Sequence, residues 1–474
     1  MSNLNFEDFD DEPQDSTRPK RSYSDMELEE LLEAAQSGSL SIEALEELAG
    51  YHYDHGNFDE ALKFLEVLAE FSPFSSDVWE RQGMVYNNMG KYQLALDSFE
   101  KAETLNPDDA ELLINKGITL DNLGRFQDAL VCFNRALVIE PENDEAYLSK
   151  GIALERSNEY EQAISIFTNL LNKDGNNKDA WYELGFCYDC TDRFADALEC
   201  YRRHLDLAPF NANAWYNLGV IHNRTGRYRR AVECYDTALA IHEEFPSAWY
   251  NRGNSCVNLK WMEEAIESYK RTLHYEPHDE MAWHNLGNAF EECGDLHEAI
   301  RCYSEALTID PTHYESFYSR GSVYDTLDDF QHALEDYTAS IQLAPDISEI
   351  WYARADAEYN LGLYVEALQS YSTVVRMEPD NAEAWLDFAE TLFEAKEYDR
   401  ALDAVRRSVA LDEGWIDAQY LHAKIAFMVK DRAETVHALT KLLDLAPGRY
   451  LQVADEFPFI RRMPAFRKYQ PSKR

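Results

Sequence analysis

The feature that most constrains this chain is a short phrase that returns every 34 residues. The phrase "NAWYNLG" at 213–219 has counterparts in "DAWYELG" at 179–185, "SAWYNRG" at 247–253 and "MAWHNLG" at 281–287. Eleven alanines keep the same step without a slip: Ala61, Ala95, Ala129, Ala163, Ala197, Ala231, Ala265, Ala299, Ala333, Ala367 and Ala401. A fixed period of this length indicates stacked supersecondary units, so the fold is expected to be repetitive.

Further columns appear when the repeats are aligned on these alanines. The fourth place is mostly tryptophan: Trp79, Trp181, Trp215, Trp249, Trp283, Trp351 and Trp385. The eighth place is mostly glycine: Gly83, Gly117, Gly151, Gly185, Gly219, Gly253, Gly287 and Gly321. An aromatic residue follows each alanine by four positions from Phe99 to Tyr371. The columns therefore mix large and small apolar residues at fixed offsets.

These offsets predict two helices per repeat. Places 4, 7 or 8, and 11 follow the spacing of one apolar helical stripe, and the alanine and its aromatic lie one turn apart on a second helix. Glycine at the fifteenth place, with Asn158 and Asp192 as substitutes, suits a left-handed helix C-cap. The small eighth and twentieth places let helix backbones approach closely, and the fourth-place aromatic is expected to fill the space beside them.

The pattern Trp-x2-Leu-Gly-x2-Tyr, then Ala-x3-Phe/Tyr, then Pro resembles the tetratricopeptide repeat family. The resemblance covers residues 42–447 and implies an all-α, right-handed superhelical solenoid of about twelve helix-turn-helix repeats. The first repeat has Leu45 and Ala49 in place of Trp and Gly, and the last has Gln419 and Thr435 at two of its conserved places. Atypical terminal repeats are normal where a solenoid meets water.

The two ends of the chain differ from the repeats. Residues 1–24 are polar and acidic and are expected to be disordered, and residues 25–41 are expected to form an amphipathic capping helix. Residues 448–474 carry seven basic and two acidic residues and resemble the segments that close many such solenoids. A basic end folded onto an acidic body would account for this composition without a functional role.

Composition narrows the classes of partner. The net charge is −44, so nucleic acid is an unfavourable partner and basic protein segments remain open. The N-terminus lacks the pattern of a signal peptide, and no apolar run reaches the ~18 residues of a membrane span. Eight cysteines are spread along the chain without the density of a disulfide scaffold. A cytoplasmic protein is expected.

The residues give little support for catalysis, a metal or a cofactor. Cys187 and Cys190 in "CYDC" have no second cysteine pair, and His52 and His55 in "YHYDH" have no matching carboxylate or cysteine column. A cysteine column on the second helix is expected to be packing: Cys132, Cys200, Cys234 and Cys302. The repeats leave no room for a separate catalytic domain, so an enzyme is the least favoured interpretation.

The family resemblance implies protein or peptide binding on a concave face lined by first-helix places. The fifth place holds Tyr182, Tyr216, Tyr250, His284, Tyr318 and Tyr352. The twelfth place holds Asp189, Asn223 and Glu291 among other acidic or amide residues. The expected groove is therefore aromatic and acidic, and it favours a basic partner segment. The alternative is that some of these tyrosines complete packing between repeats.

Two known binding modes of the family can be compared with these places. Asn217, Asn251 and Asn285 at the sixth place resemble the asparagine ladder in the repeat arm of O-linked N-acetylglucosamine transferase, whose amides bond a substrate backbone. The ladder breaks at Glu183 and Ser319, so only a short stretch could act in this way. The carboxylate clamp that binds chaperone C-termini needs lysines at the second and fifth places, which this chain lacks.

One candidate surface departs from the acidic trend. Six arginines are expected to form a patch for an acidic segment, or to be ordinary solvated side chains: Arg202, Arg203, Arg224, Arg227, Arg229 and Arg230. The sequence as a whole favours a non-enzymatic scaffold or adaptor. The alternative is an assembly or regulatory chaperone that holds one basic client. The partner's identity and the oligomeric state do not follow from the residues.

Overall fold

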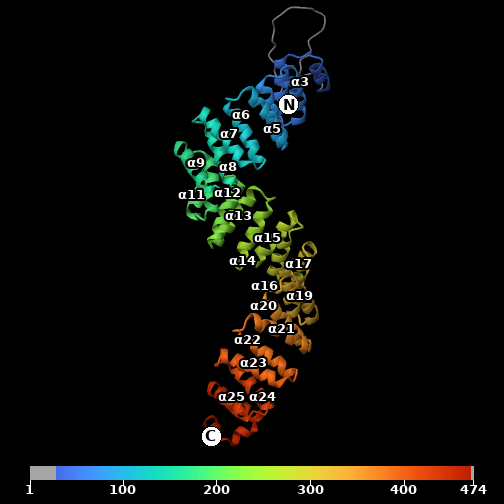
Figure 1. Cartoon of the computed structure of the whole chain (residues 1–474), viewed down its shortest axis with the longest axis vertical. Helices are drawn as coiled ribbons and strands as arrows, with labels where there is room; N and C mark the ends of the chain where they lie inside the picture. The colour runs from blue at the N-terminus through green and yellow to red at the C-terminus, as the bar shows by residue number, and fades with distance from the viewer. Residues whose placement is uncertain (1–27, 471–474) are drawn as a thin grey trace, which may run out of the picture. The chain divides into compact units, whose positions relative to one another are not determined.

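The structure is a computed structural model that describes residues 28–470, within which the regular elements are helical. Contacts between residues divide the chain into two compact units, of which unit 1 ends at Gly226 and unit 2 begins at Arg227. Figure 1 shows the helices following one another in pairs along the chain. None of the helices within the described range is long and apolar enough to cross a membrane.

Helices α2 to α25 form twelve pairs, each with a first helix of 13 residues and a second of 14. The first helices are α2 (Ile42–Asp54), α4 (Ser76–Asn88), α6 (Ala110–Asn122), α8 (Asp144–Arg156), α10 (Lys178–Cys190), α12 (Ala212–Arg224), α14 (Pro246–Asn258), α16 (Glu280–Glu292), α18 (Tyr314–Thr326), α20 (Ser348–Asn360), α22 (Ala382–Glu394) and α24 (Ile416–Met428). The second helices are α3 (Phe58–Phe71), α5 (Tyr92–Leu105), α7 (Phe126–Ile139), α9 (Tyr160–Lys173), α11 (Phe194–Leu207), α13 (Tyr228–Ile241), α15 (Met262–Tyr275), α17 (Leu296–Ile309), α19 (Phe330–Leu343), α21 (Tyr364–Met377), α23 (Tyr398–Leu411) and α25 (Arg432–Leu445). The predicted all-α fold of about twelve helix-turn-helix repeats is confirmed.

The eighth-place glycines allow the close packing that the sequence predicts. A Cβ atom at Gly117 would lie 2.5 Å from the ring of Phe133, and one at Gly287 would lie 2.6 Å from the ring of Tyr303. Both rings are completely buried. A side chain at these places would therefore displace the central aromatic of the second helix.

The turn between the two helices of a pair adopts the expected left-handed C-cap. Gly56 has φ +74°, and the amide of Asn57 donates to the carbonyl of His52 at 2.8 Å, as in a Schellman motif. Asn158 and Asp192 have positive φ, as predicted. The same conformation occurs at four places that the sequence pattern did not indicate: Lys260, Asp328, Lys396 and Lys430.

The fourth-place tryptophans differ from the expectation. They are half-buried, and each indole nitrogen donates to a carbonyl six residues earlier, for example Trp215 to Pro209 at 2.9 Å and Trp283 to Pro277 at 3.0 Å. The fully buried aromatics lie instead on the second helices, as at Phe133 and Tyr303. Each tryptophan therefore stabilises the turn before its first helix through a hydrogen bond. Its ring also covers part of the apolar face of that helix.

Helix α1 (Leu28–Gln36) begins the described part of the chain, and residues 1–24, expected to be disordered, lie outside it. Leu31 and Ala35 of α1 are buried in one apolar cluster with Leu45 and Leu65. The helix therefore covers the end of the first repeat.

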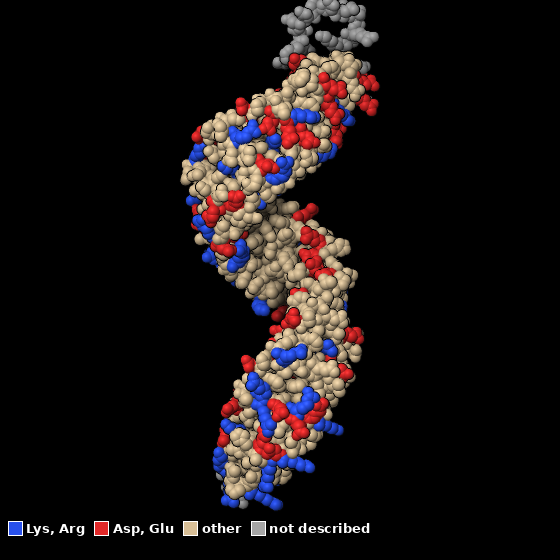
Figure 2. All heavy atoms as spheres, viewed as in Figure 1, with Lys and Arg blue, Asp and Glu red and all other residues tan. Residues whose placement is uncertain are grey.

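The C-terminal segment comprises α26 (Tyr450–Glu456) and three short 3₁₀ helices, η2 (Pro447–Arg449), η3 (Pro458–Arg462) and η4 (Pro464–Tyr469). Phe457 and Phe466 are buried in a cluster with Leu442 of α25. Lys468 forms an ion pair with Asp444 at 2.8 Å, and Figure 2 shows basic side chains gathered beside acidic ones at this end of unit 2. The C-terminal segment thus covers the end of the last repeat.

First helices of neighbouring pairs lie close to one another within each unit. In unit 1, α6 contacts α4 and α8, and α10 contacts α8 and α12, while in unit 2, α18 contacts α16 and α20. Second helices of neighbouring pairs make fewer such contacts. The first helices therefore line the inner side of the stack in each unit, which is where the predicted groove residues lie.

Candidate functional site

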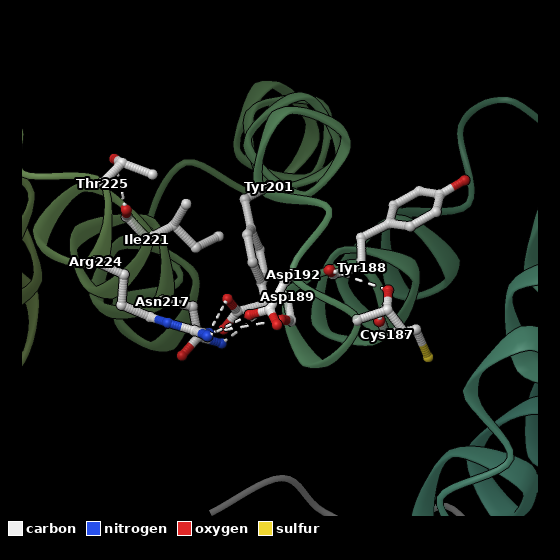
Figure 3. Close-up of polar contacts among 10 residues, drawn as sticks. Cys187, Tyr188, Asp189, Asp192, Tyr201, Asn217, Ile221, Arg224 and Thr225 are labelled. Carbon is white, nitrogen blue, oxygen red and sulfur yellow. Dashed lines mark hydrogen bonds and ion pairs between the residues drawn. The ribbon is translucent and has the colours of Figure 1, made fainter.

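The predicted tyrosines and asparagines of the inner face bond to each other across repeat boundaries. The Asn217 amide donates to the phenol oxygen of Tyr182 at 3.1 Å and to that of Tyr201 at 3.2 Å. In unit 2, the Asn285 amide donates to Tyr250 at 2.8 Å. Figure 3 places Asn217 beside the ring of Tyr201. The alternative that tyrosines complete packing between repeats therefore holds for Tyr182 and Tyr250.

This pairing changes what the short asparagine ladder can do. Both N–H donors of Asn217 are taken by phenols, so its side chain offers a ligand only a carbonyl oxygen. Asn285 has one donor engaged by Tyr250. The amides that the sequence assigned to a substrate backbone are therefore used, in these two cases, to hold neighbouring first helices together.

The prediction for His284 is corrected by the structure. This side chain is buried, with only 9% of its surface exposed, and its Nδ1 lies 2.9 Å from the hydroxyl of Ser316 on α18. Burial lowers the pKa of His284 to about 4, with His313 acting in the same direction. At neutral pH it is an uncharged residue that packs against Ser316 of the next first helix.

The remaining predicted groove residues are half-buried on the inner helices. Tyr318 lies with its ring centroid 5.9 Å from that of Tyr337, and Glu291 accepts a hydrogen bond from Tyr303 at 2.7 Å. Tyr216 and Asn223 on α12, and Asn251 on α14, are half-buried as well. Each of these side chains keeps some surface that a partner could contact.

Asp189 and the arginines of the predicted basic patch form local pairs. Arg224 forms ion pairs with Asp189 at 2.7 Å and Asp192 at 2.6 Å, and Figure 3 shows its guanidinium pointing between the two carboxylates. Burial raises the pKa of Asp189, and Arg224 opposes that shift. Arg224 is therefore committed to its own neighbours and is not a free site for an acidic segment.

The other five arginines of the patch are exposed, but they divide between the two units. Arg202 and Arg203 belong to unit 1, where Arg203 pairs with Glu199 at 3.0 Å. Arg227, Arg229 and Arg230 belong to unit 2, where Arg229 lies over the ring of Trp261. Each group resembles ordinary solvated arginines, which is the alternative to an acid-binding patch that the sequence left open.

Three carboxylates on successive first helices of unit 2 form an unusual electrostatic feature of the inner face. Asp325 on α18, Asp356 on α20 and Asp387 on α22 are half-buried, and we call them the acidic row. Burial, together with the charges of Asp387 and Asp325, raises the pKa of Asp356 to about 6. Burial also raises the pKa of Asp387 to about 6. One buried oxygen of Asp325, Oδ1, accepts no hydrogen bond.

The groups that contact the acidic row are phenols and further acids. Tyr371 donates to Asp356, and Tyr352, one of the predicted groove tyrosines, donates to Asp387. These hydrogen bonds lower the pKa of each carboxyl, but neighbouring carboxylates such as Glu383 raise it. The row is thus hydrogen-bonded by its phenols and lacks a charge-balancing cation among residues 28–470.

Sequence reasoning found part of this row. Asp325 occupies the twelfth place that the resemblance assigns to the concave face, whereas Asp356 and Asp387 occupy the ninth and sixth places and were not selected. The ninth place lies one helical turn from the fifth and the twelfth places, so an acidic residue there was a usable signal. The position of Asp387 relative to Asp356 depends on how neighbouring repeats are rotated with respect to each other. The spacing of residues within one repeat does not determine this rotation.

Family models described as Tetratricopeptide repeat match segments along most of this helix array. The matched residues are 76–109, 110–143, 146–179, 212–245, 246–279, 281–313, 318–376 and 361–425. These segments span more than half of the chain. The chain belongs to the tetratricopeptide repeat family. Tetratricopeptide repeats generally mediate binding of proteins or peptides, and the matches include no enzyme domain.

Solved structures similar to this chain include YrrB and MamA. YrrB, described as a TPR protein with an unusual peptide-binding site, is 23% identical, with a TM-score of 0.37, over 40% of this chain and 97% of its own. MamA is 25% identical, with a TM-score of 0.33, over 34% of this chain and 94% of its own. MamA from Desulfovibrio magneticus RS-1 is 23% identical, with a TM-score of 0.33, over 35% and 95%. No curated protein matches the chain.

Proposed function

We propose that this tetratricopeptide repeat protein is a non-enzymatic scaffold or adaptor that binds a basic segment of a partner protein along its inner face. The observation that carries the proposal is the acidic row of Asp325, Asp356 and Asp387. The groove tyrosines Tyr318 and Tyr352 come from two of the same helices and supply aromatic surface for the partner. A cytoplasmic location is part of the same proposal and rests on the sequence.

The electrostatics of the row favour a cationic partner. A half-buried carboxylate without a cation is destabilised by lost hydration and by its acidic neighbours, which is why its pKa rises. A lysine or arginine of the partner placed between Asp356 and Asp387 would relieve both effects. The net charge of −44 adds a long-range attraction that speeds the encounter but cannot by itself select a site.

The proposal can be tested with a short fluorescein-labelled peptide that alternates arginine and leucine, followed by fluorescence anisotropy on the full-length protein. The double variant Asp356→Asn/Asp387→Asn keeps shape and hydrogen-bond acceptors while removing two charges. We expect it to bind the peptide about tenfold more weakly than the wild type, equivalent to about 1.4 kcal/mol. Equal affinity for the wild type and this variant would refute the proposed site.

A matched control distinguishes the effect of charge position on peptide affinity from the effect of net charge. Glu366 on α21 and Asp399 on α23 are exposed on second helices of the same unit. The variant Glu366→Gln/Asp399→Asn removes the same charge from the other side of the stack. It is expected to bind the peptide with nearly wild-type affinity, because exposed charges are screened by salt.

A further inference from the structure

A separate cavity lies at the beginning of unit 1, away from the acidic row in sequence. It has a volume of about 370 Å³ and is lined by residues of α2, α3, α4 and α6. We call it the N-terminal pocket. Its size falls within the range of ligand sites in proteins, which is about 300–1,000 Å³. The cavity is therefore large enough for a long side chain and part of its neighbour.

The floor of the N-terminal pocket is apolar. Leu65 and Val85 are buried core residues whose side chains reach the cavity, and Met84 lies beside them. Methionine adapts its shape to different contacts, and an apolar floor stabilises hydrocarbon groups placed on it. The floor therefore suits an aliphatic chain rather than a fully polar ligand.

The wall of the pocket is acidic. Asp77, Glu80 and Glu111 line it together with one cation, Arg81, which pairs with Asp77 at 3.5 Å. Glu80 is half-buried and forms no ion pair within the described part of the chain; its one hydrogen bond comes from the amide of Asn115 at 3.3 Å. Burial raises the pKa of Glu80 to about 7, and nearby acids add to the shift. A cation beside Glu80 would offset both effects.

Gly50 keeps the pocket open on the side of α2. A Cβ atom built on Gly50 would meet nothing within 4 Å, and the residue lies inside a 13-residue helix where alanine would be more favourable. Packing therefore does not require a glycine here, in contrast to the eighth-place glycines. A larger side chain at this place would extend into the cavity.

We propose that the N-terminal pocket binds a lysine or arginine side chain, together with an adjacent apolar residue, from an extended segment of a partner protein. The aliphatic stem would lie on Leu65, Met84 and Val85, and the charged end would reach Glu80. Long basic side chains combine these two properties in one residue. This inference rests on the proposed function, because it names a second contact for the same class of basic segment.

The test uses the arginine-leucine peptide and the full-length protein carrying Asp356→Asn/Asp387→Asn, so that the acidic row does not contribute. In this background Gly50→Leu fills the pocket without changing charge, and we expect peptide affinity to fall about tenfold or more. Ala195→Leu, on the exposed surface of α11, is the matched control and is expected to bind within about twofold of its parent. A peptide with norleucine in place of arginine is expected to lose most of its affinity.

A second variant tests the charge and guards against a folding defect. Glu80→Gln is expected to weaken binding severalfold, whereas Glu47→Gln on the exposed side of α2 is expected to leave it unchanged. Circular dichroism and the melting temperature of each variant verify the fold. Unchanged affinity in both Gly50→Leu and Glu80→Gln would overturn the inference.

Two further results separate the possible failures. If Arg18→Ala/Lys20→Ala/Arg21→Ala raises peptide affinity, the chain's own basic residues compete for the pocket and the proposal of a partner segment is overturned. If Gly50→Leu has no effect while Asp356→Asn/Asp387→Asn weakens binding in the wild-type background, the pocket inference fails and the proposed function stands. The reverse pattern would support the pocket and refute the acidic row.

Discussion

The side-chain amide of Asn285 donates to the phenol oxygen of Tyr250 across a repeat boundary, with Nδ2 and Oη 2.8 Å apart. The two residues lie 35 positions apart, as do Asn217 and Tyr182, which bond at 3.1 Å. Some polar side chains of the inner face thus form hydrogen bonds with one another. A residue there can serve stability and recognition at once, and the two uses can be separated by mutation.

Tyr250→Phe keeps the ring and removes the hydroxyl that accepts from Asn285. The expected cost is about 1 kcal/mol of unfolding free energy, because one partly buried hydrogen bond is lost. Thermal unfolding followed by circular dichroism measures the change. Tyr398→Phe is the control, since the ring of Tyr398 packs 5.4 Å from Phe393 and its hydroxyl forms no hydrogen bond among residues 28–470. Equal melting temperatures for the two variants would show that the Tyr250 hydroxyl does not stabilise the repeat boundary.

Gly117→Ala tests the close packing of the two helices within a repeat. The added methyl group would lie 2.5 Å from the ring of Phe133, so we expect a loss of about 1–3 kcal/mol through overpacking. Gly50→Ala, which meets nothing within 4 Å, is expected instead to gain up to about 1 kcal/mol from helix propensity. Chemical denaturation of both variants measures their unfolding free energies. A higher unfolding free energy for Gly117→Ala than for the wild type would contradict the proposed close packing.

The acidic row predicts an unusual dependence of stability on pH. Asp356 and Asp387 have folded-state pKa values raised to about 6, above the unfolded value of about 3.9. Between these values the folded state binds more protons than the unfolded state, so their contribution to stability falls as pH rises from about 4 to 6. Above pH 6, Asp356→Asn/Asp387→Asn is expected to be more stable than the wild type by about 1–2 kcal/mol.

The measurement for this prediction is the melting temperature of both proteins from pH 4 to pH 8. The difference between them should be small at the acidic end and grow toward pH 6.5, because the wild-type carboxyls ionise over that interval. The control variant Glu366→Gln/Asp399→Asn should follow the wild type throughout. A difference that is constant with pH would mean that the row titrates at ordinary values.

Much of the fold followed from spacing, because contacts within one repeat recur at fixed offsets. Close packing at the glycine of place 8 was predicted, but its contact in the structure is the aromatic 16 residues later, as at Gly117 and Phe133, and not the predicted fourth-place aromatic. The left-handed turn was recognisable at Gly56 and Asn158 but not at Lys260, since lysine rarely adopts positive φ and its presence there reflects the demand of the turn.

The site was less predictable because it depends on contacts between repeats. The fifth-place pattern treats His284 and Tyr318 alike, although His284 is buried against Ser316 and Tyr318 is half-buried. The raised pKa values of Asp356 and Asp387 depend first on burial and then on neighbouring carboxylates, which a list of acidic residues does not reveal. The N-terminal pocket depends on space left by Gly50, and spacing alone cannot indicate a cavity.

The most direct measurement of the central claim is where a basic segment lies on the protein. The arginine-leucine peptide can carry a benzophenone photo-crosslinker, and mass spectrometry of the crosslinked full-length protein identifies the labelled residues. The account predicts labels on the first helices α18, α20 and α22 and a marked loss of those labels in Asp356→Asn/Asp387→Asn. Labels on the second helices α19, α21 and α23 that persist in this variant would contradict it.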